Sequence, residues 1–227
     1  LQRAREPYSG PVETLEPDEV RRILNSIDTD SVLGFRDYLL YSLLYRLGLR
    51  IGEALSVNLE DIDLDKELIL IHGKGRRNRT LPLVSDIPTL IEKWLCLRRW
   101  LSGSEGLNAL FISKKGNRLS ARKAQDNFQK VIASVGPLSI AKVTPHTLRH
   151  AFASHALEED ATDAKLIVLK SVLGHALLKS TEIYLHPSMK LLRRAVNDHP
   201  ASEILEDIIK TDKIIIRVQQ ARAAPAA

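Results

Sequence analysis

Residues 33–48 read L-G-F-R-D-Y-L-L-Y-S-L-L-Y-R-L-G and contain the longest apolar run of the chain. Apolar side chains fall on almost every side of the helix that this segment predicts, and Gly48 is a typical stop signal. Such a helix must be covered on all sides in water, so we expect it at the centre of the core. Ser42 and Arg46 keep the run well short of the roughly 20 apolar residues that cross a bilayer, so no membrane partner is expected.

The flanking segments predict more helices and one small sheet. Before the central helix, apolar residues at positions 20, 23, 24 and 27 follow helical spacing from Pro17 onward. After a short helix at 51–57, two short apolar runs at 67–72 and 80–84 predict a β-hairpin, and Pro82 places the second strand at an edge. Further helices are predicted over 86–101, 121–135, 144–158, 164–173, 180–185 and 189–196. The expected fold class is mainly α with a small antiparallel β-sheet (α+β).

Composition narrows the class of protein. The chain has 227 residues, a formal net charge of +5 and 44% hydrophobic residues, which excludes a wholly disordered or fibrous chain. The single cysteine, Cys96, excludes an internal disulfide and a cysteine-rich zinc ribbon, and it is compatible with a reducing compartment. No apolar segment follows the N-terminal charges as in a secretory signal. We therefore expect a soluble, cytoplasmic protein.

Two segments, 73–79 and 111–125, carry several cations and no acid. Either segment alone is more typical of a solvated surface, but cations clustered in this way can also neutralise nucleic-acid phosphates. Aromatic residues, 5% of the chain, do not alternate with these cations, so double-stranded DNA is a better partner than a stacked single strand. The candidate DNA-binding residues are Arg76, Arg77, Arg79, Lys114, Lys115, Arg118, Arg122 and Lys123.

Two of the predicted helices carry further expectations. The helix at 121–135, capped by Ser120, has side chains that can contact base edges in a major groove, but by spacing alone it is equally an ordinary exposed face. The residues concerned are Arg122, Lys123, Gln125, Asn127, Gln129 and Lys130. In the helix at 86–101, Trp94, Cys96 and Trp100 are expected to lie in the core.

A histidine and an arginine stand together at the start of another predicted helix. Thr144 and Pro145 are an N-cap and a first-turn proline, so His146 and Arg149 share one face near the positive end of the helix dipole. That arrangement suits an anion. Alone, however, so short a motif often arises by chance.

Three more short motifs lie elsewhere in the chain. Arg50 occurs in G-L-R-I-G-E directly after the central helix, and Lys74 lies between two glycines at the predicted hairpin tip. Leu173-Gly174-His175 is followed nine positions later by Tyr184. Each motif has an ordinary interpretation: Arg50 can pair with Glu53, and Lys74 can be a plain turn residue.

In this order and spacing, the motifs resemble the catalytic domain of the tyrosine recombinase (phage integrase) family over about residues 14–196. The resemblance implies a tyrosine recombinase or type IB topoisomerase-like fold. It implies cleavage of a DNA strand to give a 3′-phosphotyrosine link and a free 5′-hydroxyl. The 5′-hydroxyl of a partner strand then attacks the phosphotyrosine and rejoins the DNA as the tyrosine leaves. The outcome would be integration, excision or resolution of mobile DNA. The catalytic residues that it implies are Arg50, Lys74, His146, Arg149, His175 and Tyr184.

The chemistry of these side chains fits that reaction. Two guanidiniums and His175 can stabilise the charge that grows on the phosphate oxygens, so neither a cofactor nor a metal is expected. A phenol with a pKa near 10 needs a base, for which His146 is the candidate, and Lys74 can protonate the leaving 5′-oxygen. A zinc site at His146, His150 and His155 is disfavoured, because this spacing does not keep all three on one helix face.

We expect residues 1–13 to be a linker arm, 14–198 the catalytic domain and 199–227 a C-terminal tail. The resemblance implies an additional helical domain upstream, which this chain does not contain. The tail has an apolar stripe at Ile204, Leu205, Ile208 and Ile209. It can pack on its own domain or, as the resemblance implies, dock on a neighbouring protomer in a homo-tetramer assembled on DNA in the nucleoid.

Two other functions remain open at this stage. A type IB topoisomerase-like enzyme would relax supercoils by the same chemistry without a partner site. A non-catalytic DNA-binding module would keep the fold alone, although it would not require all six catalytic side chains.

Overall fold

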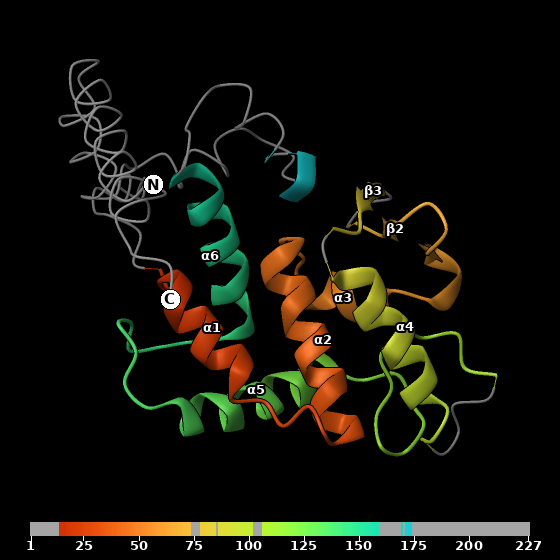
Figure 1. Ribbon diagram of the computed structural model, residues 1–227, viewed down its shortest axis with the longest axis horizontal. Helices are drawn as coiled ribbons and strands as arrows, with labels where there is room; N and C mark the ends of the chain where they lie inside the picture. The colour runs from red at the N-terminus through yellow and green to blue at the C-terminus, as the bar shows by residue number, and fades with distance from the viewer. Residues whose placement is uncertain are drawn as a thin grey trace, which may run out of the picture. The chain divides into compact units, whose positions relative to one another are not determined.

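The computed structural model describes residues 14–73, 78–84, 86–101, 106–158, 169 and 171–173, all within one compact unit, Val12–Leu185. The predicted helices at 180–185 and 189–196, most of 164–173 and the tail lie outside these residues. The described elements are α1 (Pro17–Asn25), α2 (Val32–Arg46), α3 (Ile51–Ser56), the 3₁₀-helix η1 (Leu59–Asp61), β1 (Ile62–Asp63), β2 (Leu68–Ile71), β3 (Arg79–Pro82), α4 (Ile87–Arg98), α5 (Ala121–Val135) and α6 (Pro145–Glu158) (Figure 1).

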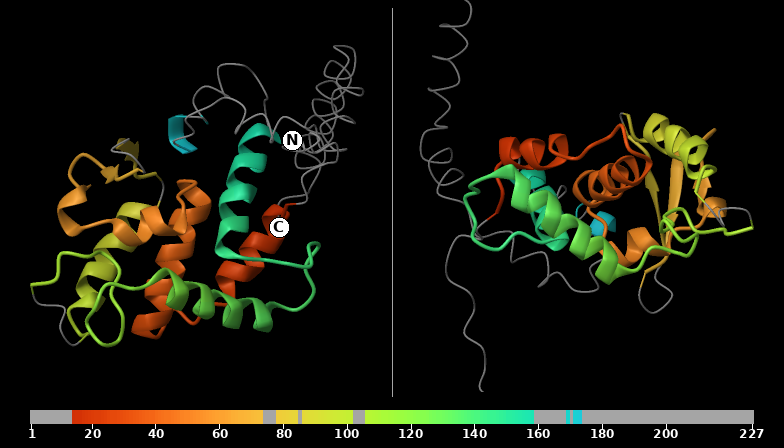
Figure 2. Two further views of the ribbon diagram at one scale, coloured as in Figure 1. Left: turned by 180° about the vertical axis from the view of Figure 1, so that it is seen from behind. Right: turned by 90° about the horizontal axis from the view of Figure 1, so that it is seen from below.

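Helix α2 lies at the centre of the core, as predicted. It packs against α1, α3, α4, α5 and α6, and Figures 1 and 2 show it surrounded by helices. Leu39, Leu40, Leu43 and Leu44 have no exposed surface, so the helix is covered on several sides at once. Tyr41, also fully buried, donates a hydrogen bond of 2.8 Å from Oη to the carbonyl oxygen of Ala124 in α5. Burial of these large apolar side chains is the main stabilising term of the fold.

The sheet is antiparallel with strand order β1-β2-β3. Its register pairs Leu68 with Pro82 and Ile71 with Arg79, so the predicted hairpin and the edge position of Pro82 are confirmed. Ile69 and Ile71 of β2 are fully buried, which fixes the sheet against the helices. The register also places Arg79 at the start of β3, next to the hairpin turn.

Helix α4 corrects one expectation. Trp94 is fully buried and donates from Nε1 to the carbonyl oxygen of Leu110 at 2.9 Å, but Trp100 is 82% exposed and Cys96 is also exposed. The helix ends at Arg98, so Trp100 lies beyond its last turn, and Cys96 lies on the face away from the buried residues.

Within the described ranges, no helix is long and apolar enough to span a membrane.

Candidate active site

Arg50 and Arg149 come together although they belong to different elements. Arg50 directly precedes α3, and Arg149 lies in the second turn of α6. Arg149 is 1% exposed and donates from Nη1 to the carbonyl oxygen of Gly48 at 2.5 Å and from Nη2 to that of Leu173 at 2.9 Å. Nη1 of Arg50 reaches the same Leu173 oxygen at 3.4 Å. The two guanidiniums therefore share one backbone acceptor.

Glu53 is the carboxylate at the centre of this cluster. It accepts hydrogen bonds from the backbone nitrogen and Nη1 of Arg50 at 3.0 and 2.8 Å, and Nη1 of Arg149 lies 3.7 Å from its Oε2. Arg79 adds two more bonds, Nη1 to Oε1 at 3.2 Å and Nη2 to Oε2 at 2.9 Å. One buried negative charge thus faces three positive ones, and the excess suits the binding of an anion.

The ionisation of Glu53 follows from the same contacts. Burial alone would raise its pKa, but the hydrogen bonds from Arg79 and Arg50 outweigh burial and hold the pKa below 4.5. The carboxylate is therefore charged at neutral pH. Sequence reasoning treated Glu53 only as an ordinary partner of Arg50. The signal that points to it is the three-residue spacing from Arg50 across the start of a helix.

The structure gives Arg79 a different place from the predicted one at the DNA surface. Its side chain is only 11% exposed, and besides both oxygens of Glu53 it donates from Nε to the carbonyl oxygen of Val172 at 2.7 Å. A guanidinium with all three of its nitrogens engaged inside the protein is not free to neutralise a DNA phosphate. The prediction that Arg79 binds DNA is therefore corrected, because β3 directs this side chain inward to Glu53.

The exposed member of the arginine cluster is Arg50. Its side chain is 44% exposed, against 7% for Glu53 and 1% for Arg149. A phosphate that approaches from solvent meets Arg50 first. Arg149 contributes fixed positive charge from behind. Glu53 restrains both guanidiniums, so little reorganisation is needed when an anion arrives.

His146 lies on the first turn of α6, next to these charges. Partial burial, followed by the positive charges of Arg149 and Arg50, lowers its pKa below 6.5. Its ring packs edge-on against His150, with 4.4 Å between the centroids, and burial lowers the pKa of His150 to about 4. Both imidazoles are therefore neutral at pH 7, the state in which His146 can accept a proton.

Three of the six predicted catalytic residues, Lys74, His175 and Tyr184, lie outside the described residues. Two candidate DNA-binding residues, Arg76 and Arg77, also lie outside them. Leu173, whose carbonyl oxygen meets Arg50 and Arg149, is two positions before His175 in the sequence. The described half of the site is therefore Arg50, His146 and Arg149, with Glu53 as the common neighbour of the two arginines.

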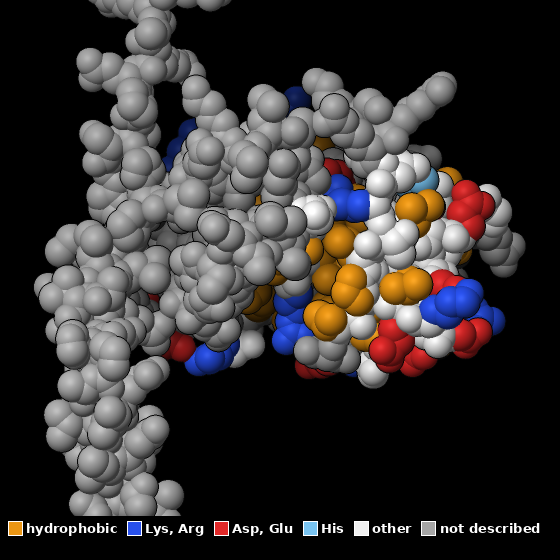
Figure 3. Space-filling model, turned by 90° about the horizontal axis from the view of Figure 1, so that it is seen from above, with side chains coloured by type: hydrophobic (Ala, Val, Ile, Leu, Met, Phe, Trp, Pro, Cys, Tyr) orange, Lys and Arg blue, Asp and Glu red, His pale blue; other side chains and the backbone are white. Residues whose placement is uncertain are grey.

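The other candidate DNA-binding residues divide by how their side chains are used. Lys114, Lys115, Arg122 and Lys123 are exposed. Arg118 is exposed too, but it donates from Nη1 to the carbonyl oxygen of Leu55 at 2.7 Å and from Nη2 to Asn58 at 2.5 Å, which caps the end of α3. On the face shown in Figure 3, cationic side chains lie beside hydrophobic ones, and acidic side chains gather towards one edge of the described part.

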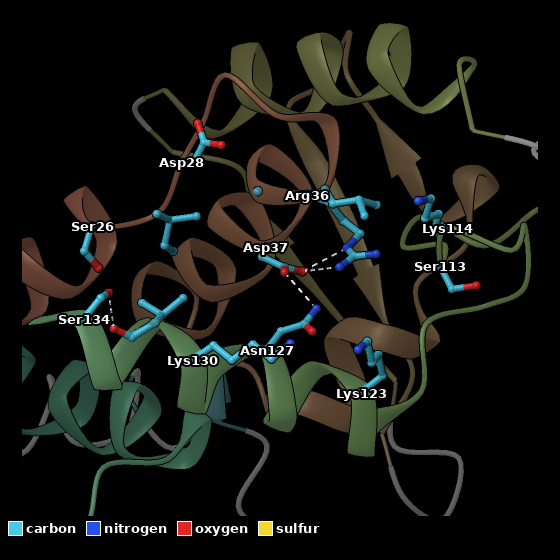
Figure 4. Close-up of a pocket in the computed structure, with 14 residues that line it drawn as sticks. Ser26, Asp28, Arg36, Asp37, Ser113, Lys114, Lys123, Asn127, Lys130 and Ser134 are labelled. Carbon is cyan, nitrogen blue, oxygen red and sulfur yellow. Dashed lines mark hydrogen bonds and ion pairs between the residues drawn. The ribbon is translucent and has the colours of Figure 1, made fainter.

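Helix α5 uses two of its predicted base-contacting residues internally. Asn127 donates to Asp37 Oδ2 at 2.9 Å, and Gln129 donates to the carbonyl oxygen of Val143 at 2.9 Å. Lys114 and Lys123 line an open hollow of about 460 Å³ between α5 and the start of α2, above the pair of Arg36 and Asp37 (Figure 4). The cations of α5 are exposed, whereas Asn127 and Gln129 each use their amide nitrogen in a hydrogen bond within the protein.

His155 and the pair of His146 and His150 have separate partners. His155 bonds through Nδ1 to the Tyr45 hydroxyl at 2.9 Å and through Nε2 to the carbonyl oxygen of Leu15 at 2.8 Å, whereas His146 and His150 pack edge-on against each other. Over the described ranges, no group of three or more histidine, cysteine or acidic residues is placed to hold a metal ion.

Comparison with known sequences gives matches over most of the chain. A family model described as the Phage integrase family matches residues 13–190. The tyrosine recombinase XerC of Alcanivorax borkumensis is 37% identical over 207 residues, covering 89% of this chain and 66% of that protein. The XerC of Thermodesulfovibrio yellowstonii is 35% identical over 194 residues, covering 83% of this chain and 63% of that protein.

Solved structures give the same picture for the fold. The XerH site-specific recombinase, bound to a palindromic difH substrate in a post-cleavage complex, has a TM-score of 0.68 and 28% identity, covering 82% of this chain and 52% of that one. The XerA recombinase has a TM-score of 0.69 and 25% identity, covering 83% and 65%. The predicted fold class, mainly α with a small antiparallel sheet, is confirmed. The chain spans about half to two thirds of the length of these relatives.

Proposed function

This chain belongs to the phage integrase family, and from that premise we propose that it is the catalytic part of a site-specific DNA recombinase. It cleaves and rejoins DNA strands through a covalent 3′-phosphotyrosine intermediate. Integration, excision or resolution of mobile DNA is the proposed outcome. Its proposed location is the cytoplasm, in association with the nucleoid.

The observation that carries this proposal is the convergence of Arg50 and Arg149 on Glu53 and on the Leu173 carbonyl. A phosphodiester gains negative charge on its non-bridging oxygens in the transition state, and fixed guanidiniums stabilise that charge. Arg50 is exposed enough to contact such a phosphate, whereas Arg149 is held rigidly beneath it. Two fixed guanidiniums at one place can supply this stabilisation.

The proposed reaction needs two proton transfers, one from the attacking tyrosine and one to the leaving 5′-oxygen. The Tyr184 hydroxyl attacks phosphorus as its proton passes to His146, which is neutral at pH 7 because its pKa is lowered. The bond from phosphorus to the 5′-oxygen breaks as Lys74 protonates that oxygen, and His175 donates to a phosphate oxygen. Rejoining reverses these steps: the 5′-hydroxyl of a partner strand attacks phosphorus, and Tyr184 leaves. The phosphotyrosine conserves the bond energy, so no ATP is consumed.

Assembly is part of the same proposal. Residues 1–13 serve as a linker arm, residues 14–198 carry catalysis, and residues 199–227 dock on a neighbouring protomer of a DNA-bound homo-tetramer. Deleting residues 199–227 is expected to abolish assembly of paired sites while binding to a single site remains. Unchanged pairing of DNA sites by the truncated protein would refute tail exchange.

Trapping the covalent intermediate tests the function. The protein is incubated with a nicked suicide duplex in EDTA and then run on a denaturing gel. We expect a DNA-linked protein band that disappears in Tyr184→Phe and persists in Tyr38→Phe, a matched change at a half-buried tyrosine of α2.

The other outcomes of this experiment separate the competing functions. Cleaved DNA without a protein-linked band, formed only when a divalent metal is present, would indicate a hydrolytic nuclease. No band under any condition would leave a non-catalytic DNA-binding module. In a separate assay with supercoiled plasmid, relaxation without recombinant products would favour a type IB topoisomerase-like enzyme.

A further inference from the structure

Arg79 connects three parts of the fold through one side chain. It is the first residue of β3, it donates to both carboxylate oxygens of Glu53 in α3, and it donates from Nε to the carbonyl oxygen of Val172 at 2.7 Å. Val172 is adjacent to Leu173, whose own carbonyl oxygen accepts from Arg50 and Arg149. Two consecutive carbonyl groups are therefore held by three arginines.

These contacts are unlike an ordinary surface ion pair. The side chains of Arg79 and Glu53 are 11% and 7% exposed, so solvent screens the pair little, and the two parallel bonds fix the plane of the guanidinium. The planar guanidinium places Nε so that it reaches Val172 while both Nη atoms stay on Glu53. A lysine, with a single compact ammonium, cannot span both partners.

We propose that Arg79 is a positioning residue, which latches residues 172–173 onto the arginine pair and thereby sets the backbone that leads into His175. It acts through Glu53 and Val172 and touches no DNA itself. This inference rests on the proposed function, in which the segment after Leu173 carries a donor to the phosphate. The same side chain anchors the start of β3, so the hairpin and the 172–173 segment are held in one arrangement.

The latch differs from a purely electrostatic role. Arg50 and Arg149 would still pair with Glu53 without Arg79, and Leu173 would keep its bond to Arg149 at 2.9 Å. What is lost is the donor to the Val172 carbonyl. Arg79→Lys keeps the positive charge beside Glu53 but loses the hydrogen bond to the Val172 carbonyl. The variant therefore separates the electrostatic role of Arg79 from its positioning role.

The experiment compares wild type, Arg79→Lys and Arg79→Gln in strand cleavage of the suicide duplex under single-turnover conditions at saturating DNA. We expect the cleavage rate to fall about ten- to a hundredfold in both variants, because small displacements of catalytic groups cost up to about a hundredfold. The dissociation constant for DNA, from gel shifts, is expected to change less than about twofold. Lys66→Gln is the matched control, since it removes a cation from the turn between β1 and β2 whose side chain is 72% exposed. It should leave both quantities unchanged.

A second measurement does not depend on activity. Compared with wild type, Arg79→Lys should take up deuterium faster in the peptide covering 169–175, whereas uptake over α1 should be unchanged. Full activity in Arg79→Lys, weaker DNA binding with an unchanged rate at saturation, or unchanged exchange at 169–175 would each overturn the inference. If wild type forms no covalent product, the proposed function fails, while the exchange experiment still decides whether the latch exists.

Discussion

The guanidinium of Arg149 donates a hydrogen bond of 2.5 Å to the carbonyl oxygen of Gly48, 101 positions earlier in the chain. Gly48 has a φ of 60°, in the left-handed region, two residues after the end of α2 and two residues before Arg50. A β-carbon built on it would lie 2.4 Å from Cδ1 of Phe152 in α6. The glycine thus allows α2 and α6 to approach closely enough for Arg149 to reach its acceptor.

Gly48→Ala should therefore lower the free energy of unfolding by roughly 2 to 4 kcal/mol, from left-handed strain of about 1 to 2 kcal/mol and a comparable overpacking cost. Urea denaturation measures the change. Gly52→Ala is the matched control, because a β-carbon there meets nothing within 4 Å. Since Gly52 lies inside α3, alanine should stabilise slightly, by up to about 1 kcal/mol. Equal effects at the two glycines would contradict the packing described for Gly48.

The two site arginines should differ in their effect on stability. Arg149→Ala leaves the Gly48 and Leu173 carbonyls without this donor in a buried region, and a loss of about 3 kcal/mol is expected. Arg50→Ala removes a side chain that is 44% exposed, so its loss should stay near 1 kcal/mol. Both variants should lose covalent product formation. Thermal and urea denaturation of both variants measures the loss of stability, and the suicide-substrate gel measures covalent product formation. An Arg149→Ala protein as stable as wild type would contradict the expected difference.

Glu53→Gln should destabilise the protein by about 3 to 5 kcal/mol at pH 7, because three guanidiniums then lack their shared counter-charge. The pH dependence has a definite sign. The folded pKa of Glu53 is below 4.5, so its contribution is present above about pH 4.5 and is lost as the pH falls through the folded pKa. Denaturation curves from pH 3 to 7 should therefore show a smaller acid loss in Glu53→Gln than in wild type. Glu60→Gln, at an exposed glutamate, is the control. Identical acid profiles for wild type and Glu53→Gln would refute this role.

His150 should make stability fall on acidification over a different range. Burial lowers its pKa from 6.5 to about 4, so the unfolded chain binds the proton first. The contribution of His150 to the free energy of unfolding is fully present above pH 6.5. It declines as the pH falls towards 4, by roughly 3 kcal/mol in total. His150→Gln should flatten this part of the profile. Proton NMR titration of the His150 ring measures the pKa directly, and a value at or above 6.5 would rule out the burial effect.

The sequence predicted those features that depend on local spacing. The all-round apolar pattern of residues 33–47 identified the core helix, and two short apolar runs with Pro82 identified the hairpin and its edge. The pairing of His146 with Arg149 on one helical face also follows from three-residue spacing alone. None of these requires knowledge of distant neighbours.

The predictions that failed depend on distant partners. Arg79 belongs to a basic turn by composition, but the β3 register directs it to Glu53, 26 residues earlier, and to Val172, 93 residues later. Trp100 has an apolar side chain, yet α4 ends before it can be buried. For α5 the sequence left base contacts and an ordinary exposed face equally open, and Asn127 and Gln129 there donate to Asp37 and Val143. Lys74, His175 and Tyr184 remain predictions from sequence.

The most direct test of the central claim is the identity of the residue that becomes linked to DNA. After reaction with the suicide duplex, nuclease trimming and protease digestion, mass spectrometry locates the nucleotide remnant on a peptide. We predict a nucleotide 3′-phosphate on the Tyr184 side chain. Cleaved DNA with no remnant on any peptide, or a remnant on a residue other than Tyr184, would contradict the account.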